Sequence, residues 1–170
     1  MQRLGLLVAI ATSLLIGCAS AELTVVRPLE APVGEVSLAI NPPASGQMTA
    51  EERSRLRSTL TTRLVDGGVS VVAKDEAGAS SLVGDLEHYD PGNRALRYWV
   101  GLGAGRGRLA SRWVVKDPSG SELGACRVDG GISGGRFGGS YDEVLEKAGD
   151  RLADFLLNRD YASWHVRLWL

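Results

Sequence analysis

Two helix-start signals, separated by a long strand-like interval, constrain the fold of this chain more than any other feature of its sequence. Thr49 and Glu52 form the first capping box, a T-x-x-E pattern in which each side chain bonds the backbone amide of the other. Ser140 and Glu143 form the second. An apolar stripe at helical spacing follows each box, so each predicts a helix that packs one face against a sheet. The two stripes are Leu56, Leu60 and Leu64, and then Val144, Leu145, Ala148, Leu152, Phe155 and Leu156.

Strand-like segments occupy most of the chain outside these helices. Residues 35–40 alternate polar and apolar side chains, and Asn41-Pro42-Pro43 ends the run. Asp117-Pro118-Ser119-Gly120 is a strong turn signal that predicts a hairpin. The fold class is therefore α/β (α+β), a single domain in which two helices flank a mixed sheet of about five strands, in the order β-α-β-β-β-β-α. The expected strands cover residues 35–40, 69–74, 81–90, 108–117 and 122–130.

The N-terminal segment is typical of a bacterial lipoprotein leader. Arg3 precedes an apolar run over residues 4–16, which is shorter than the ~20 residues that a membrane-spanning helix needs. Leu15-Ile16-Gly17-Cys18 resembles a lipobox, in which a signal peptidase cuts after Gly17 and the thiol of Cys18 carries the lipid. An ordinary secretory signal with a chance cysteine is the alternative. Because no Asp follows Cys18, resemblance to Gram-negative lipoproteins implies a periplasm-facing anchor in the cell outer membrane.

This leader divides the chain into four parts. Residues 1–17 form the signal peptide, and residues 18–34 hold the lipidated cysteine and a tether with little periodicity. Residues 35–158 form the α/β domain, and residues 159–170 form a tail that is a possible edge strand. A contact between the aromatic residues of the tail and the membrane surface is the alternative.

Charge and cysteine content narrow the possible partners. The formal net charge of −1 gives no indication of a nucleic-acid partner. The expected partners are the membrane, through the N-terminal lipid, and a protein of the envelope. With Cys18 acylated, Cys126 has no partner within the chain, which predicts a buried thiol or an intermolecular disulfide.

The stretch from Gly92 to Leu109 holds five glycines and four arginines and no acidic residue. No Lys-Ser or Lys-Thr follows the glycines, so the pattern does not support a phosphate-binding loop. A dinucleotide fingerprint needs a helix at this point, whereas residues 106–115 alternate like a strand. The arginines on one face of that strand form either a solvated surface or a basic patch for lipid head groups, lipopolysaccharide phosphates or an acidic partner. The candidate contact residues are Arg94, Arg97, Arg106, Arg108 and Arg112.

A pattern of glycines and arginines runs through the second half of the chain. It includes Gly92-Asn93-Arg94, Arg97 and the Gly101-Leu102-Gly103-Ala104-Gly105 run. With these segments the chain resembles, over about Val36 to Asn158, a family of bacterial lipoproteins catalogued as domain of unknown function 4410. The resemblance implies an α/β envelope lipoprotein and brings no established activity with it. Further segments that fit the family are Val115 to Asp117, Gly130 to Gly135 and Phe137 to Ser140.

One pattern mimics a catalytic motif without its context. Gly131-Ile132-Ser133-Gly134-Gly135 matches G-x-S-x-G, but a nucleophile elbow needs a helix directly after the serine, and four residues separate this segment from the next helix start. His165 could act as the base, with Asp142 or Asp160 orienting it. A hydrolase fold needs more sheet than this chain can build, so we expect no catalytic residue.

We also expect no metal and no cofactor. His88 lies among Asp85, Glu87 and Asp90, a cluster more typical of a solvated strand edge than of a calcium site. The leading hypothesis is a noncatalytic, lipid-anchored accessory or assembly factor of the envelope. The alternative is a binding module that holds an anionic envelope component, a lipid head group or a polysaccharide, through the arginine face. A small hydrolase that depends on Ser133 is the third hypothesis.

Overall fold

The computed structural model describes residues 19–45, 47–74, 76, 78–93, 107–132 and 140–159. These residues form six strands and two helices, close to the five strands and two helices expected. The elements are β1 (Ala19–Arg27), β2 (Glu35–Asn41), α2 (Ala50–Asp66), β3 (Ser70–Val72), β4 (Ser80–Asp90), β5 (Arg108–Lys116), β6 (Glu122–Ile132) and α4 (Tyr141–Leu156).

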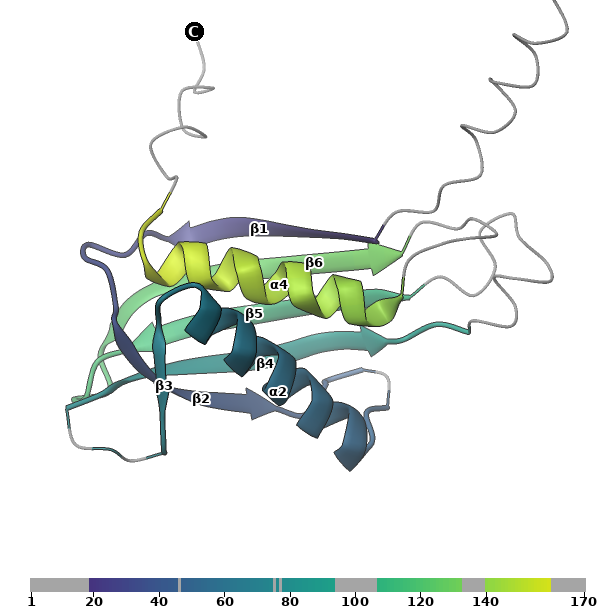
Figure 1. The fold of residues 1–170 in the computed structure, drawn as a ribbon, viewed down its shortest axis with the longest axis horizontal. Helices are drawn as coiled ribbons and strands as arrows, with labels where there is room; N and C mark the ends of the chain where they lie inside the picture. Colours follow the sequence, from purple (N-terminus) through teal and green to yellow (C-terminus); the bar gives the residue numbers. More distant parts are fainter. Residues whose placement is uncertain are drawn as a thin grey trace, which may run out of the picture.

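The strands form one mixed sheet with the order β1-β6-β5-β4-β2-β3. β2 is parallel to β3 and β4, and the other neighbours are antiparallel. The hairpin of β5 and β6 around Asp117–Gly120 confirms the turn prediction. Both helices lie on the same side of the sheet (Figure 1), so the domain has two layers. We call the side under the helices the covered face.

Local signals fix where the helices begin and end. The Thr49 amide donates to Glu52 Oε2 at 2.7 Å and the Glu52 amide donates to Thr49 Oγ1 at 3.2 Å, which confirms the first capping box. At α4 only half of the predicted second box forms among the described residues, since Ser140 Oγ accepts from the Glu143 amide at 3.3 Å but the Glu143 side chain does not bond the Ser140 amide. α2 ends at Gly67, and Gly68 follows with a φ of 96°, a left-handed conformation that glycine adopts without strain.

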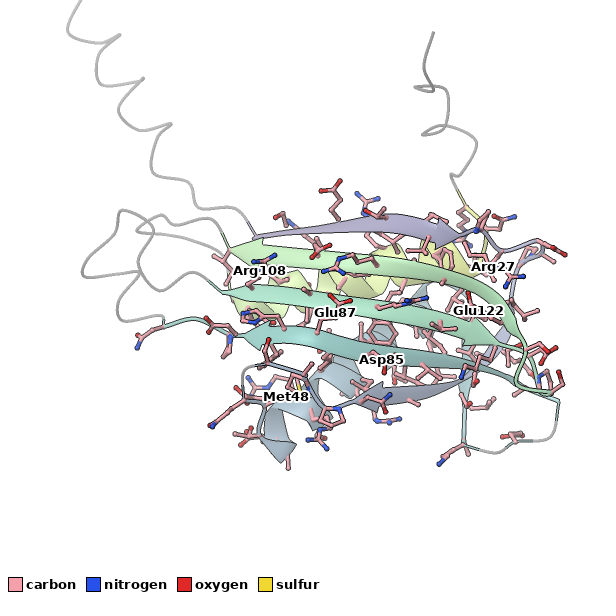
Figure 2. All side chains as sticks on the ribbon, turned by 180° about the vertical axis from the view of Figure 1, so that it is seen from behind. Arg27, Met48, Asp85, Glu87, Arg108 and Glu122 are labelled. Carbon is pink, nitrogen blue, oxygen red and sulfur yellow. The ribbon has the colours of Figure 1, made fainter. Side chains whose placement is uncertain are left out.

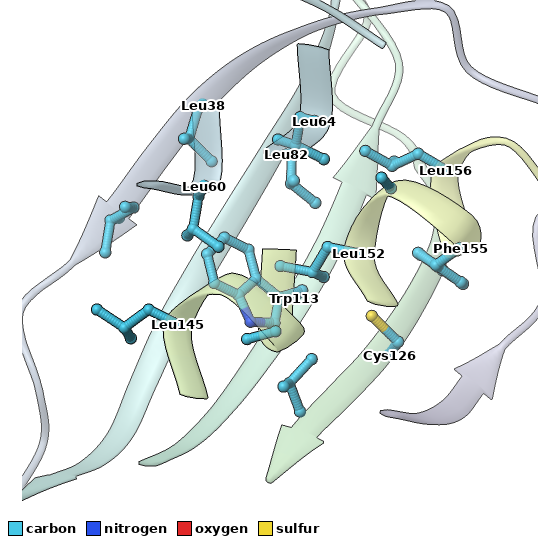
Figure 3. Close-up of a cluster of buried hydrophobic side chains, with 14 of the residues drawn as sticks. Leu38, Leu60, Leu64, Leu82, Trp113, Cys126, Leu145, Leu152, Phe155 and Leu156 are labelled. Carbon is cyan, nitrogen blue, oxygen red and sulfur yellow. The ribbon is translucent and has the colours of Figure 1, made fainter. Parts of the chain in front are cut away.

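The core lies between the helices and the covered face (Figure 3), and both predicted apolar stripes are buried in it. Trp113 of β5 is at its centre, 2% exposed, and its Nε1 donates to Ser111 Oγ at 2.9 Å. Ser111 Oγ in turn donates to the Val128 carbonyl at 3.2 Å, so the buried polar atoms of this pair are satisfied. The indole rests on Gly84, where any side chain would collide with the ring.

The N-terminal part of the sheet differs from the sequence expectation. Residues 19–27, which were expected to belong to the tether, form β1, which pairs with β6 from Ala19 opposite Ile132 to Arg27 opposite Ala125. Leu29 and Val33 are also buried, and the Val33 amide donates to the Leu156 carbonyl at 2.8 Å. The segment is therefore part of the domain. The strand signal is present in the sequence, because Ala19, Ala21, Leu23 and Val25 alternate with polar residues, but the assignment of this segment to a tether overlooked it.

The tail from residue 160 onward, where an edge strand is expected, lies outside the described residues. In the described part of the chain, β1 occupies the sheet edge next to β6.

Candidate functional site

The face of the sheet opposite the helices is a broad polar surface, which we call the open face (Figure 2). Within the described ranges, no helix or strand packs over it. It arises from simple alternation, because every second residue of a strand points away from the helices. Its charged members on β1, β4, β5 and β6 are Glu22, Arg27, Asp85, Glu87, Asp90, Arg108, Arg112, Lys116, Glu122, Arg127 and Asp129.

Arg127 of β6 organises the centre of the open face. Its Nη1 lies 2.7 Å from Glu87 Oε2, across β5, and its Nε donates to Asp129 Oδ2 at 2.9 Å on its own strand. The hydrogen bond to Asp129, together with the charges of both carboxylates, raises the pKa of the guanidinium. Ala110 of β5 lies in register between His88 and Asp129 and is only 3% exposed, as expected if the bridge passes over its small side chain.

β5 confirms the alternation predicted from its sequence. Arg108 and Arg112 are exposed, while Leu109 and Trp113 are buried on the covered face. No ion pair within 4.0 Å joins either arginine to an acid of the described residues. Arg94, Arg97 and Arg106, the other candidate contact residues, lie outside that part of the chain.

The neighbours of these two arginines change the expected charge of the surface. Arg112 lies opposite Asp85 of β4 and Arg127 of β6, and Arg108 lies opposite Asp90. The absence of acids from the stretch therefore does not make a basic patch, because the adjacent strands bring carboxylates to the same face. The described surface carries both signs in close alternation.

The acidic cluster around His88 does not converge on one point. Asp85 Oδ1 accepts from Asn41 Nδ2 at 2.6 Å, and Asp90 Oδ1 accepts from the Gly92 amide at 2.8 Å. His88 Nδ1 lies 2.9 Å from Ser45 Oγ. Among the described residues, no group of three or more potential ligands is arranged to hold a metal ion.

Two tyrosines pack together at the end of the sheet where β4 stops and α4 begins. The rings of Tyr89 and Tyr141 meet edge to face, with centroids 5.4 Å apart. Burial raises the pKa of Tyr89 to about 12 and raises that of Tyr141 as well. The Tyr141 hydroxyl is buried without a hydrogen-bond partner in the described structure. Both phenols are therefore neutral at physiological pH and serve packing.

A groove of about 590 Å³ lies at the other end of the sheet, between residues 29–35 and the starts of β4 and β6. Its charged residues are spread along the rim, where Arg27 and Glu122 approach to 4.0 Å. No buried polar group among the described residues of the groove points to a ligand, so it offers little chemistry.

The potential nucleophiles give no active site in the described part of the chain. Cys126 is fully buried, the first of the two predicted alternatives, and burial raises the pKa of its thiol to about 12, so it is protonated and inert. Asp142 lies in the exposed first turn of α4, 3.9 Å from Arg55. The remaining predicted residues, Gly17, Cys18, Ser133, Asp160 and His165, fall outside the described residues.

Sequence reasoning missed the bridge from Arg127 to Glu87 and Asp129. One half of it carries a local signal, because Arg127 and Asp129 are two residues apart on a strand and so point to the same side. The other half joins residues of two strands that are not adjacent, which no local pattern indicates.

A family model described as Domain of unknown function (DUF4410) matches residues 35–134. Two solved structures share the fold, both of the PelC dodecamer from Paraburkholderia phytofirmans. A leucine-to-methionine variant of it is 17% identical, with a TM-score of 0.53 over 84% of this chain and 98% of that one. The second is 16% identical, with a TM-score of 0.53 over 82% and 97% of the two chains. No curated protein matches the chain in sequence. In the described part of the chain, no helix is long and apolar enough to cross a membrane.

Proposed function

The chain belongs to the DUF4410 family, and from this premise we propose that it is a lipid-anchored, periplasm-facing lipoprotein of the cell outer membrane that acts as a noncatalytic assembly factor. Its partners are the membrane, through the lipid on Cys18, and further copies of the same chain, which associate through the open face. Neither association requires a catalytic residue.

The leader supports the anchor. The apolar run over residues 4–16 is too short to span a bilayer and ends in a lipobox-like segment with Gly17 and Cys18. The absence of an Asp after Cys18 favours the outer membrane over the inner membrane. The side chains of the open face favour a binding role, since its charged residues bond one another or solvent and do not converge on a reacting centre.

The charge pattern of the open face is the observation that supports the proposal of self-association. It presents Arg108 and Arg112 without an ion-pair partner in the described structure, beside Glu22, Asp85 and Asp90. A surface that alternates in sign can meet a second copy of itself with opposite charges in contact. The fold is also that of the subunit of a dodecamer, which gives this arrangement of helices and strands a precedent for assembly.

Native mass spectrometry of the full-length protein, gently extracted from envelopes, tests the proposal. The wild type is expected to carry a lipid and to form a complex of several copies. The double variant Arg108→Glu/Arg112→Glu should be monomeric, because it reverses the charge of the two arginines that form no ion pair with the described residues and leaves the open face predominantly acidic. Arg53→Glu/Arg151→Glu, which makes the same charge change on exposed helical residues, is the matched control and should assemble normally. A monomeric wild type would refute self-association.

Arg108 and Arg112 form no ion pair with the described residues, which also favours a second candidate, a module that binds an anionic envelope component such as a lipid head group or a polysaccharide. In that case the wild type would be a monomer that retains lipid or saccharide. Raised salt, or the Arg108→Glu/Arg112→Glu variant, would release the ligand. The mixed charge of the described surface makes this the weaker of the two.

A further inference from the structure

No linker separates the predicted lipid attachment site from the first strand of the sheet. Ala19 is already in β1, opposite Ile132, and it is 4% exposed. Its carbonyl accepts a hydrogen bond from Lys147 Nζ of α4 at 2.7 Å, which holds it against the covered face. Cys18 directly precedes it, and consecutive Cα atoms are about 3.8 Å apart. A lipid on Cys18 therefore places the start of β1 at the membrane.

Several elements share the end of the sheet where β1 starts, which we call the proximal end. β5 and α4 also begin there, and β4 and β6 end there (Figure 1, right). The opposite or distal end carries the β5–β6 turn and the last turn of α4. At about 3.3 Å per residue, the nine residues of β5 separate the two ends by roughly 30 Å.

We propose that the proximal end lies on the lipid surface, so that the strands run away from the membrane and the open face stands upright on it. The proposal rests on the lipid anchor of the proposed function. The partner is the head-group layer of the outer membrane, and the described contacts are the start of β1 and the ends of β4 and β6.

The charges of the proximal end agree with a surface held there by the anchor. Among the described strand ends, Asp90 at the end of β4 lies opposite Arg108 at the start of β5, so neither sign dominates there, and the first turn of α4 adds the exposed carboxylates of Asp142 and Glu143. Their neighbours at the end of β6 and the start of β1, Gly131 and Ser20, are uncharged. The described part of this end therefore presents no basic patch that would bind anionic head groups by itself. Its attachment comes from the acyl chains, and its orientation from the single peptide bond between lipid and sheet.

This orientation also gives the proposed assembly its geometry. With the strands pointing away from the membrane, the open face and the β1 edge look sideways along the bilayer. Copies anchored in the same leaflet then meet these surfaces by diffusing in two dimensions.

Two labelled variants of the full-length, lipidated protein in phosphatidylethanolamine–phosphatidylglycerol vesicles test the orientation. Ser20→Cys places an exposed thiol at the proximal end, and Ser119→Cys places a matched one in the distal turn. Cys18 is consumed by the lipid and Cys126 is buried, so a thiol-reactive fluorophore labels only the new cysteine. A nitroxide quencher on the lipid head group should quench the proximal label several-fold more than the distal one, at low and at high salt. Equal quenching, or stronger quenching of the distal label, would overturn the proposal.

A linker variant tests whether the short attachment between Cys18 and β1 sets the orientation. Twelve Gly and Ser residues inserted between Cys18 and Ala19 add a flexible tether of roughly 20 Å. The difference between the two labels should then largely disappear. A difference that persists would show that the proximal end binds lipid by itself, and that the short attachment does not set the orientation.

The mass of the purified protein shows whether a negative result refutes the lipid anchor or only the orientation. A chain without the lipid mass refutes the anchor, and the orientation falls with it. A lipidated chain whose two labels are quenched equally keeps the anchor of the proposed function and refutes the orientation alone.

Discussion

Trp113 and Arg112 are adjacent on β5, yet they belong to surfaces with opposite roles. Trp113 is enclosed by the helices, packs on Gly84 and donates a hydrogen bond to Ser111, so close packing and this bond fix the position of its side chain. Arg112 stands on the open face with no ion pair in the described structure. The same strand therefore carries a surface defined by packing and a surface defined by charge.

This difference indicates how the molecule separates stability from recognition. Buried apolar area and close packing on the covered face supply most of the free energy of folding. Exposed charges contribute little to stability, because water screens them, but they decide which surface can approach them. Substitutions on the two faces of one strand should therefore have effects of very different size and kind.

The largest expected effect comes from emptying the covered face. Trp113→Ala should lower the free energy of unfolding by about 3–5 kcal/mol, because it removes the largest buried side chain and leaves a cavity above Gly84. The matched control is Val114→Ala, on the same strand but half-buried on the open face, which should lower it by no more than about 1.5 kcal/mol. Urea denaturation of the full-length protein in detergent measures both. Similar decreases in the free energy of unfolding for the two variants would contradict the view that packing on the covered face supplies most of the stability.

The covered face could be predicted from the sequence because its signals are local. The first capping box, the Ser140 cap, the apolar stripes and the Asp117–Gly120 turn each depend on residues that lie close together in the sequence. β1 also has a local signal, since Ala19, Ala21, Leu23 and Val25 alternate with polar residues, and it was missed because the segment was assigned to a tether. Its pairing with β6, more than 90 residues later, leaves no local trace.

The open face was predictable only in part, for the same reason. Alternation placed Arg108 and Arg112 on one exposed surface, and the structure agrees. The character of that surface depends on strands that the order of residues does not reveal, since Asp85 and Asp90 come from β4 and Arg127 from β6. A basic run in the sequence became a surface of mixed charge in the sheet.

Cys126 allows the covered face to be tested by pH. Burial raises the pKa of its thiol in the folded protein to about 12, from an ordinary value of 9.0. Above pH 9 the unfolded chain loses this proton and the folded chain keeps it, so stability is fully present below pH 9 and declines as pH rises. The decline attributable to this thiol approaches about 1.4 kcal/mol per pH unit. Urea titrations at about pH 8, 9 and 10 should show it, and Cys126→Ala should make the decline shallower. An equal slope in the variant would mean that water reaches the thiol.

The smallest effect on stability is expected at the centre of the open face. Arg127→Gln removes the ion pairs with Glu87 and Asp129, whose side chains are 42% and 44% exposed, while the arginine itself is 39% exposed. At this exposure the bridge contributes about 0.5–1 kcal/mol at low salt, and screening should reduce that toward zero at high salt. Arg112→Gln, which breaks no ion pair of the described residues, is the control and should leave the free energy of unfolding unchanged under both conditions. Urea denaturation at two ionic strengths gives all four values. A salt-independent loss at Arg127 as large as that at Trp113 would mean that the open face is held by packing too, and that its charges are not free to serve a partner.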